Sequence, residues 1–154
     1  MLNDVATWQP SDDEIVYDDI RAYKYRVKKT YQIAIPIFGF DIKTEYFSLN
    51  VKGALTINGG YAWDGASGPT VDHKKKTKRA SCVHDVLYQM FRLGLLDYRV
   101  YRETADVIFY KLLLADGMNR FRAWYWFRGV RRGAEYAARP KDPNAEKFDY
   151  FKGE

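Results

Sequence analysis

The spacing of apolar residues changes once along this chain, and the change limits the folds open to it. Within residues 21–58 apolar side chains alternate with polar ones, as at Tyr31, Ile33 and Ile35, which is the period of a half-buried β-strand. From Lys78 onward they recur at the spacing of an amphipathic helix. The sequence therefore predicts an α+β fold, with an N-terminal antiparallel β-meander followed by a C-terminal part of three helices.

The chain has 154 residues, which suits a single domain with a substantial core. Its first segment is polar and acidic, so we expect an arm or a poorly structured lead-in, whose Trp8 docks on the body or on a neighbouring molecule. The expected segments are an acidic arm (1–20), the β-meander (21–58), a glycine-rich loop (59–72), three helices (77–138) and an aromatic tail (139–154).

The first two predicted helices carry the residues best suited to chemistry. His84, one of two histidines in the chain, lies four residues before Tyr88, so the two share one side of the first helix. Asp85 is rotated from them by about 100°. Asp106 lies at the edge of the apolar face of the second helix, and two antiparallel helices would bring it to the His84 imidazole. A carboxylate there would fix the imidazole tautomer and stabilise the ring when it takes a proton from water.

The loop before these helices contains four glycines and a proline within residues 59–69. Such a backbone can turn its carbonyl oxygens inward, and hard cations such as calcium take carbonyl and carboxylate oxygens as ligands. Loop carbonyls together with Asp85 would make a calcium site beside His84.

A glycine-rich loop, then His-Asp-x-x-Tyr on a helix, then Ala-Asp-x-x-Phe on the next helix resembles the phospholipase A2 superfamily. The compact type found in parvovirus capsid proteins is the most similar. The resemblance implies a calcium-dependent lipase with His84 as general base and Asp85 as the calcium-ligating carboxylate. It also implies that Asp106 orients the histidine and that Tyr88 supports this aspartate.

The same resemblance extends to the loop. Trp63, Gly65 and Ser67 lie where the family has an aromatic residue and two glycines whose carbonyls bind calcium, which makes them candidate calcium ligands together with Asp64. Asp64 and Ser67 depart from the family pattern.

A second resemblance covers more of the chain, roughly residues 57–133. The elements Gly-Tyr-Ala-Trp-Asp-Gly-Ala-Ser, His-Asp-x-Leu-Tyr, Ala-Asp-x-x-Phe and a final Val-Arg-x-Gly are similar to a domain family of unknown function common in tailed bacteriophages and prophages. This resemblance implies a phage origin and no particular activity.

Charge and cysteine content limit partners and compartment. The net charge is +5, with positive residues concentrated at 73–79 and 120–139, so an anionic partner fits: lipid, nucleic acid or an acidic protein surface. We see no signal peptide and no apolar run long enough to cross a bilayer, and expect the protein in the host cytoplasm or the virion. Cys82 is the only cysteine, which excludes an intrachain disulfide and departs from the disulfide-rich secreted phospholipases.

Each motif also has a purely structural interpretation. A histidine bonded to a carboxylate can be a satisfied polar group in a core. The glycine-rich loop can be a tight connection from sheet to helix, capped by Asp64 and Ser67. For the aromatic residues of the third helix, we expect core and packing surface ahead of a lipid-binding face.

Three functions therefore remain open. The first is a phage-encoded, calcium-dependent ester hydrolase acting on phospholipid at a membrane surface. The second is a non-catalytic phage virion or tail-associated protein that docks on other virion proteins. The third is a protein that binds nucleic acid or a host protein through its basic residues.

Overall fold

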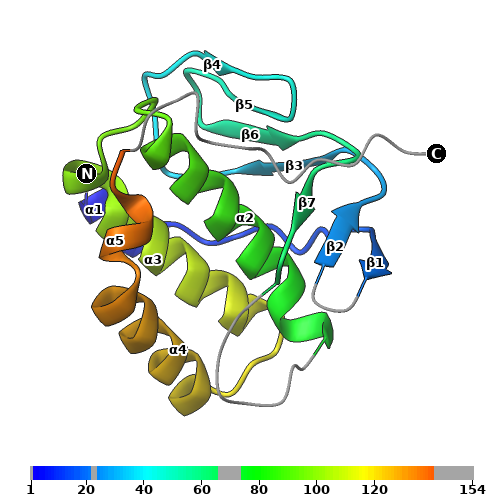
Figure 1. Ribbon diagram of the computed structural model, residues 1–154. Helices are drawn as coiled ribbons and strands as arrows, with labels where there is room; N and C mark the ends of the chain where they lie inside the picture. The colour runs from blue at the N-terminus through cyan, green and yellow to red at the C-terminus, as the bar shows by residue number, and fades with distance from the viewer. Residues whose placement is uncertain (1, 22–23, 66–73, 141–154) are drawn as a thin grey trace.

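The computed structural model describes residues 2–21, 24–65 and 74–140, and contains small antiparallel sheets packed beside a group of helices (Figure 1). The predicted α+β class, with antiparallel strands before the main helices, is confirmed. Along β3, Tyr31 and Ile33 are buried and the residues that follow each of them are exposed. Buried side chains from strands and helices join in a hydrophobic core.

The strands form two sheets instead of one continuous meander. Their orders are β1-β2-β7 and β3-β6-β5-β4, and the pairings are antiparallel. After a turn at Gly60, where φ is 101°, the chain returns beside β2, and the Val27 N–H donates to the Tyr61 carbonyl at 2.8 Å. β7 therefore lies inside the predicted glycine-rich loop. The sequence did not predict this strand, because two residues are too few to show an alternation. The strands are β1 (Tyr17–Arg21), β2 (Lys24–Val27), β3 (Tyr31–Ala34), β4 (Ile42–Lys43), β5 (Phe47–Leu49), β6 (Ala54–Ile57) and β7 (Ala62–Trp63).

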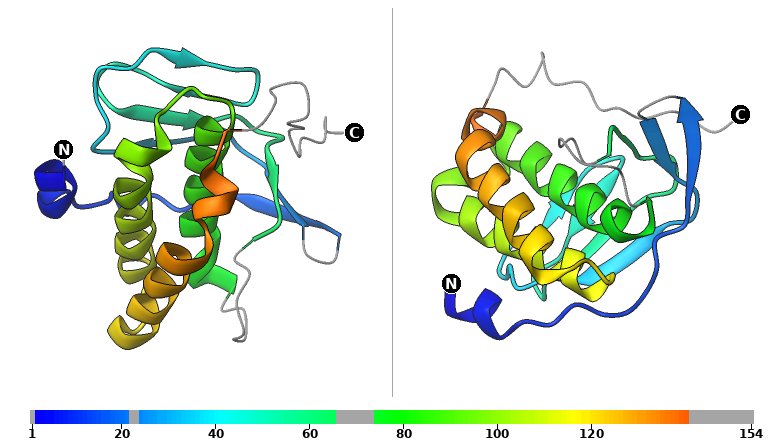
Figure 2. Two further views of the ribbon diagram at one scale, coloured as in Figure 1. Left: turned by 60° about the vertical axis from the view of Figure 1, so that its left-hand side comes forward. Right: turned by 90° about the horizontal axis from the view of Figure 1, so that it is seen from below.

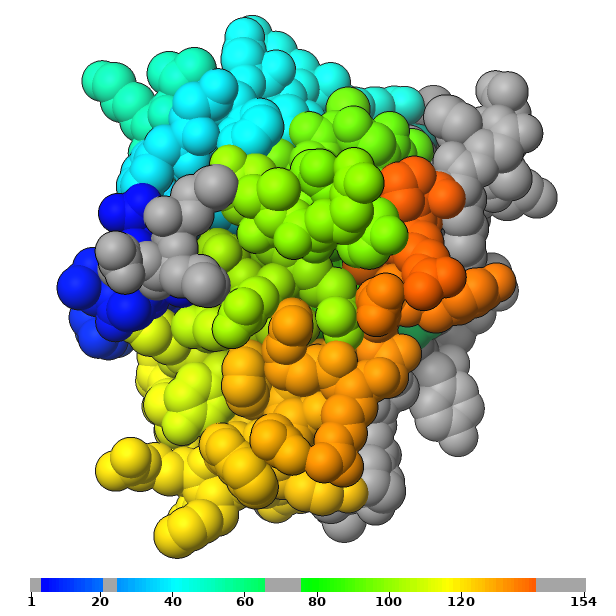
Figure 3. Space-filling model, turned by 90° about the vertical axis from the view of Figure 1, so that its left-hand side faces the viewer, coloured from blue at the N-terminus to red at the C-terminus, as the bar shows by residue number. Residues whose placement is uncertain are grey.

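The helices pack side by side, with α3 in contact with both α2 and α4. Figure 3 shows α3 in yellow-green and α4 in yellow to orange on one face of the molecule. The predicted third helix is divided, because α4 ends at Gly133 and α5 begins at Glu135. At the end of α3 the chain turns through Gly117, where φ is 94°, the left-handed conformation that glycine commonly supplies just after a helix. The helices are α1 (Leu2–Thr7), α2 (Lys74–Arg92), α3 (Tyr98–Ala115), α4 (Arg120–Gly133) and α5 (Glu135–Ala138).

The described part of the N-terminal segment is fastened to the body, and Trp8 docks there, which is one of the two positions expected for it. The segment runs around one side of the molecule from α1 to β1 (Figure 2). Lys111 on α3 donates to the carbonyls of Ala6 and Trp8 at 2.9 and 2.6 Å. The Trp8 indole donates to the Ala34 carbonyl at 3.0 Å. These bonds use backbone carbonyls, which every residue has, so the sequence pattern does not reveal them.

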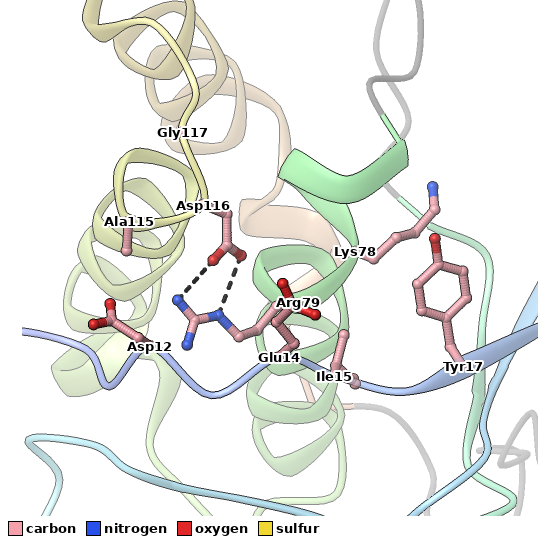
Figure 4. Close-up of a pocket in the computed structure, with 9 residues that line it drawn as sticks. All are labelled: Asp12, Glu14, Ile15, Tyr17, Lys78, Arg79, Ala115, Asp116 and Gly117. Atoms are coloured by element: carbon pink, nitrogen blue, oxygen red, sulfur yellow. Dashed lines mark hydrogen bonds and ion pairs between the residues drawn. The ribbon is translucent and has the colours of Figure 1, made fainter.

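The basic run at residues 73–79 was considered above as part of a surface for an anionic partner, and its last two cations, Lys78 and Arg79, are buried. The Arg79 guanidinium makes a two-point ion pair with Asp116 at 3.1 and 2.8 Å (Figure 4). It also donates to backbone carbonyls of the N-terminal segment. The Lys78 ammonium lies 3.9 Å from the centroid of the Tyr25 ring. These two side chains therefore hold α2 to its neighbours. Because they are buried, they do not contribute to a basic surface.

Candidate active site

The structure brings His84, Tyr88 and Asp106 together between α2 and α3. Nε2 of His84 lies 2.7 Å from Oδ1 of Asp106, and the Tyr88 hydroxyl donates to the same oxygen at 2.7 Å. Asp106 is completely buried, so both bonds lie in an interior of low dielectric constant. The imidazole and the Tyr88 ring also lie against each other, with centroids 4.2 Å apart. This carboxylate holds the imidazole in one orientation and favours the tautomer with a proton on Nε2.

Two arginines complete the network, and sequence reasoning gave neither a role in it. Arg131 donates from Nη1 to the second carboxylate oxygen of Asp106 at 2.9 Å. Arg102 donates from Nε to the Tyr88 hydroxyl at 3.3 Å. Its Nη2 donates to the carbonyls of Val130 and Arg131 at 3.0 and 2.7 Å. The available signal was the Val-Arg-x-Gly element at the end of α4, to which no chemistry had been assigned.

The environment of Tyr88 keeps its phenol protonated. Burial raises the pKa of Tyr88 well above its usual value, and the charge of Asp106 and its hydrogen bond raise it further, against a smaller opposing effect of Arg102. Tyr88 is therefore a hydrogen-bond donor to Asp106 across the physiological pH range.

A pocket of 210 Å³ opens beside His84. The side chain of His84 is 10% exposed, and its Nδ1 makes no hydrogen bond within the part of the chain that the structure describes. Because Asp106 engages Nε2, Nδ1 is the ring atom left to accept a proton from a molecule in the pocket. The lining combines polar groups with an apolar wall, and consists of Gly65, Ser81, His84, Asp85, Tyr88, Arg92, Phe109, Trp126, Val130, Ala134 and Ala137.

Of the predicted metal ligands, Asp85 and Gly65 line this pocket. The Trp63 side chain is buried and its indole donates to Ser81 Oγ at 2.9 Å, which fastens β7 to α2. Asp64 is exposed and is not among the described residues that line the pocket.

Ser67 lies outside the described residues. Within the ranges that are described, no group of three or more histidine, cysteine, aspartate or glutamate side chains could hold a metal ion. Among the predicted ligands that the structure describes, those at the pocket are the carboxylate residue Asp85 and Gly65, which has backbone oxygen only. Oxygen donors of this kind suit a hard cation such as calcium.

The chain conformation at Gly65 requires glycine. Its φ is 86°, in the region that side chains disfavour, and a Cβ there would lie 2.6 Å from the Tyr25 ring. Without a side chain, Gly65 lies close to this ring while it lines the pocket beside His84.

Comparison with known families places the chain in one of them. The model of the family described as "Protein of unknown function (DUF1353)" matches residues 40–130, which is more than half of the chain. The chain belongs to this family. The DUF1353 match covers α2 and α3 with His84, Tyr88 and Asp106, and it ends one residue before Arg131. No curated protein and no solved structure matches the chain significantly.

In the described part of this DUF1353 member, each helix is too short or too polar to span a membrane.

Proposed function

We propose that this protein is a phospholipase A2-like hydrolase that cleaves ester bonds of phospholipids, with His84 as general base. One observation carries the proposal: a completely buried carboxylate, Asp106, is bonded to both His84 and Tyr88, while the histidine lines a pocket. The helical His-Asp-x-x-Tyr and Ala-Asp-x-x-Phe elements that resemble the phospholipase A2 superfamily supply these three side chains.

The geometry suits proton transfer at Nδ1. With Nε2–H donated to Asp106, Nδ1 presents its lone pair to a water molecule in the pocket. That water loses a proton to Nδ1 as its oxygen bonds to the acyl carbon, and the proton then passes to the leaving alcohol as the ester bond breaks. The negative charge of Asp106 stabilises the imidazolium between these two steps.

The proposed cofactor is calcium, which when bound would stabilise negative charge developing on the ester oxygen. Asp85 and the glycine-rich loop at Gly65 would hold it, because both line the His84 pocket and offer oxygen ligands.

The apolar wall of the pocket supports a lipid substrate. Phe109 and Trp126 face the same space as His84, together with the small side chains of Ala134 and Ala137. Such a surface accommodates hydrocarbon next to the reacting ester, as an acyl chain requires.

Hydrolysis of mixed vesicles of phosphatidylcholine and phosphatidylglycerol tests the proposal. We expect the protein to release fatty acid with calcium and not with a chelator, and the rate to fall at least about 100-fold in His84→Gln and in Asp106→Asn. Circular dichroism must show that both variants remain folded. Absence of release by the parent protein, or equal release by His84→Gln, would contradict the proposed activity.

The metal is tested separately. Calcium should raise the melting temperature of the parent protein, because a ligand that binds only the folded state stabilises it. Asp85→Asn should abolish that rise. A shift that persists in Asp85→Asn would remove Asp85 from the proposed calcium site.

A structural role in a phage particle is the second candidate, and the three hydrogen bonds that Asp106 accepts favour it. His84, Tyr88 and Arg131 give this carboxylate three donors and connect α2, α3 and α4. The resemblance of residues 57–133 to a tailed-phage domain family supports a phage origin and a location in the virion or the host cytoplasm. Under this proposal His84→Gln lowers stability while no preparation of the protein releases fatty acid.

A further inference from the structure

The outer face of α4 carries large aromatic side chains in contact with solvent. Phe121 is 84% exposed, Trp124 53% and Tyr125 54%. They recur at the spacing of one helix face, opposite the buried Ala123 and Trp126 that pack on the body. The expectation that the aromatic residues of this helix serve mainly as core and packing surface therefore fails for these three.

Positive charge accompanies the exposed rings. The helix contains five arginines and neither aspartate nor glutamate. Arg120, Arg128 and Arg132 are exposed, and the Arg128 guanidinium lies 5.3 Å from the centroid of the Trp124 ring. We call Phe121, Trp124, Tyr125 and these three exposed arginines the α4 outer face.

The α4 outer face adjoins the pocket of His84. A surface hollow of 690 Å³ is lined by Trp124, Tyr125, Arg128 and Arg132 and shares the side chains of Trp126, Val130, Ala134 and Ala137 with the His84 pocket. A surface pressed against α4 would therefore lie next to the proposed site of chemistry. In Figure 3 the α4 side chains project from the lower part of the face shown.

We propose that the α4 outer face docks on the surface of an anionic lipid bilayer. Aromatic rings favour the headgroup region, and exposed arginines bind lipid phosphates while their aliphatic stems lie along apolar surface. A nucleic acid would complement the arginines, whereas a bilayer both complements them and covers the ring of Phe121, which is exposed in the part of the chain that the structure describes. The docking proposal rests on the proposed function, because docking would bring the active site to its phospholipid substrate. Binding to a bilayer can nevertheless be measured without hydrolysis.

The experiment uses the full chain with His84→Gln, so that lipid turnover does not change the vesicles. Flotation should show binding to vesicles of phosphatidylcholine with phosphatidylglycerol and much weaker binding to phosphatidylcholine alone. Phe121→Ser and Trp124→Ser should each weaken binding about tenfold, because each removes an exposed apolar side chain. Phe38→Ser, which removes a ring that is 52% exposed and lies outside the α4 outer face, should leave binding unchanged.

The charged part of the face has its own matched control. Replacing Arg120, Arg128 and Arg132 together by Gln should weaken binding to the anionic vesicles on the order of a hundredfold, since each basic residue at such a surface contributes about fivefold. A triple Gln variant at the exposed Lys29, Lys43 and Lys52 removes the same charge elsewhere. The affinity of this Lys control for the anionic vesicles should stay within about twofold of that of the His84→Gln protein. This result is expected if local contacts, and not net charge, hold the protein on the bilayer.

Several results would overturn the docking proposal. One is that the protein does not float with anionic vesicles. Another is that the Lys and Arg triple variants lose binding equally. A third is that the protein binds DNA in a salt-sensitive way, loses this binding in the Arg triple variant, and does not bind vesicles. The outcomes also separate this proposal from the proposed function. Binding by a protein that releases no fatty acid would remove the hydrolase and keep the docking face. Release of fatty acid that is equal in the parent and in Trp124→Ser would remove the docking face and keep the hydrolase.

Discussion

Arg131 of α4 donates a hydrogen bond of 2.9 Å to the carboxylate oxygen of Asp106 that His84 and Tyr88 leave unused. The contact joins a residue outside the family match to the centre of the network. It gives a completely buried carboxylate a cationic partner, which offsets part of the cost of removing its charge from water. The end of α4 is thereby held at the edge of the pocket.

Replacing Arg131 by Met should therefore destabilise the fold. The buried Asp106 would lose a charged donor, and such a loss costs about 2 kcal/mol or more. Urea denaturation measures the change in unfolding free energy. Arg132→Met is the matched control, because the neighbouring side chain is exposed, and its effect should stay within about 0.5 kcal/mol.

Fatty acid release offers a second measurement on Arg131→Met, without Arg132→Met as its control, because Arg132 belongs to the proposed α4 outer face. If Asp106 orients His84 for catalysis, Arg131→Met lowers the rate with little change in KM, since the defect lies in the proton transfer. Equal stability of the Arg131→Met and Arg132→Met variants would show that the contact with Asp106 contributes nothing measurable.

Tyr88→Phe should change how stability depends on pH. The pKa of Tyr88 is raised by burial, so above pH of about 10 the folded protein keeps a phenolic proton that the unfolded chain has lost. Stability therefore falls as the pH rises above about 10, by up to about 1.4 kcal/mol per pH unit for this residue. Denaturation between pH 8 and pH 11 should show a shallower decline in Tyr88→Phe. An unchanged decline would mean that Tyr88 ionises equally in both states.

The sequence was sufficient for the part of the site that lies on two neighbouring helices. His84 and Tyr88 are four residues apart, and a helical period places them on one side before any tertiary contact is known. Asp106 lies on the next helix, and a short connection makes the two helices neighbours. Arg131 could not be placed in this way. An arginine in the last turn of a helix is favourable wherever that helix docks, so its residue type carries no information on its partner.

Contacts of the N-terminal segment and of α4 were hidden for different reasons. The segment before β1 is held by Lys111 and Arg79 through backbone carbonyls, to which no sequence pattern points. In α4 apolar side chains occur around much of the helix, so periodicity did not show that Trp126 faces the body while Trp124 faces solvent.

Gly65→Ala should destabilise the protein through backbone strain and through a steric clash. The same substitution at Gly94 allows the two effects to be measured separately. The positive φ of 86° costs an alanine about 1 kcal/mol, and the new Cβ would also lie 2.6 Å from the Tyr25 ring. Gly94 has a φ of 73° and open space at its Cβ position, so Gly94→Ala measures the backbone cost alone. We expect Gly65→Ala to lower the melting temperature more than Gly94→Ala, and Tyr25→Leu to remove part of the difference. Equal effects would show that the ring yields without cost.

Cys82 gives a direct measure of how often α2 opens. It is completely buried two residues before His84, and burial, with a smaller contribution from the charge of Asp85, raises the pKa of its thiol well above the usual value. Little reactive thiolate is present, so a disulfide reagent should label the native protein slowly even at pH 9, and label one thiol promptly in denaturant. Calcium should slow native labelling if it binds beside Asp85, because binding lowers the population of open forms. Prompt labelling of the folded protein would contradict the packing of α2 described above.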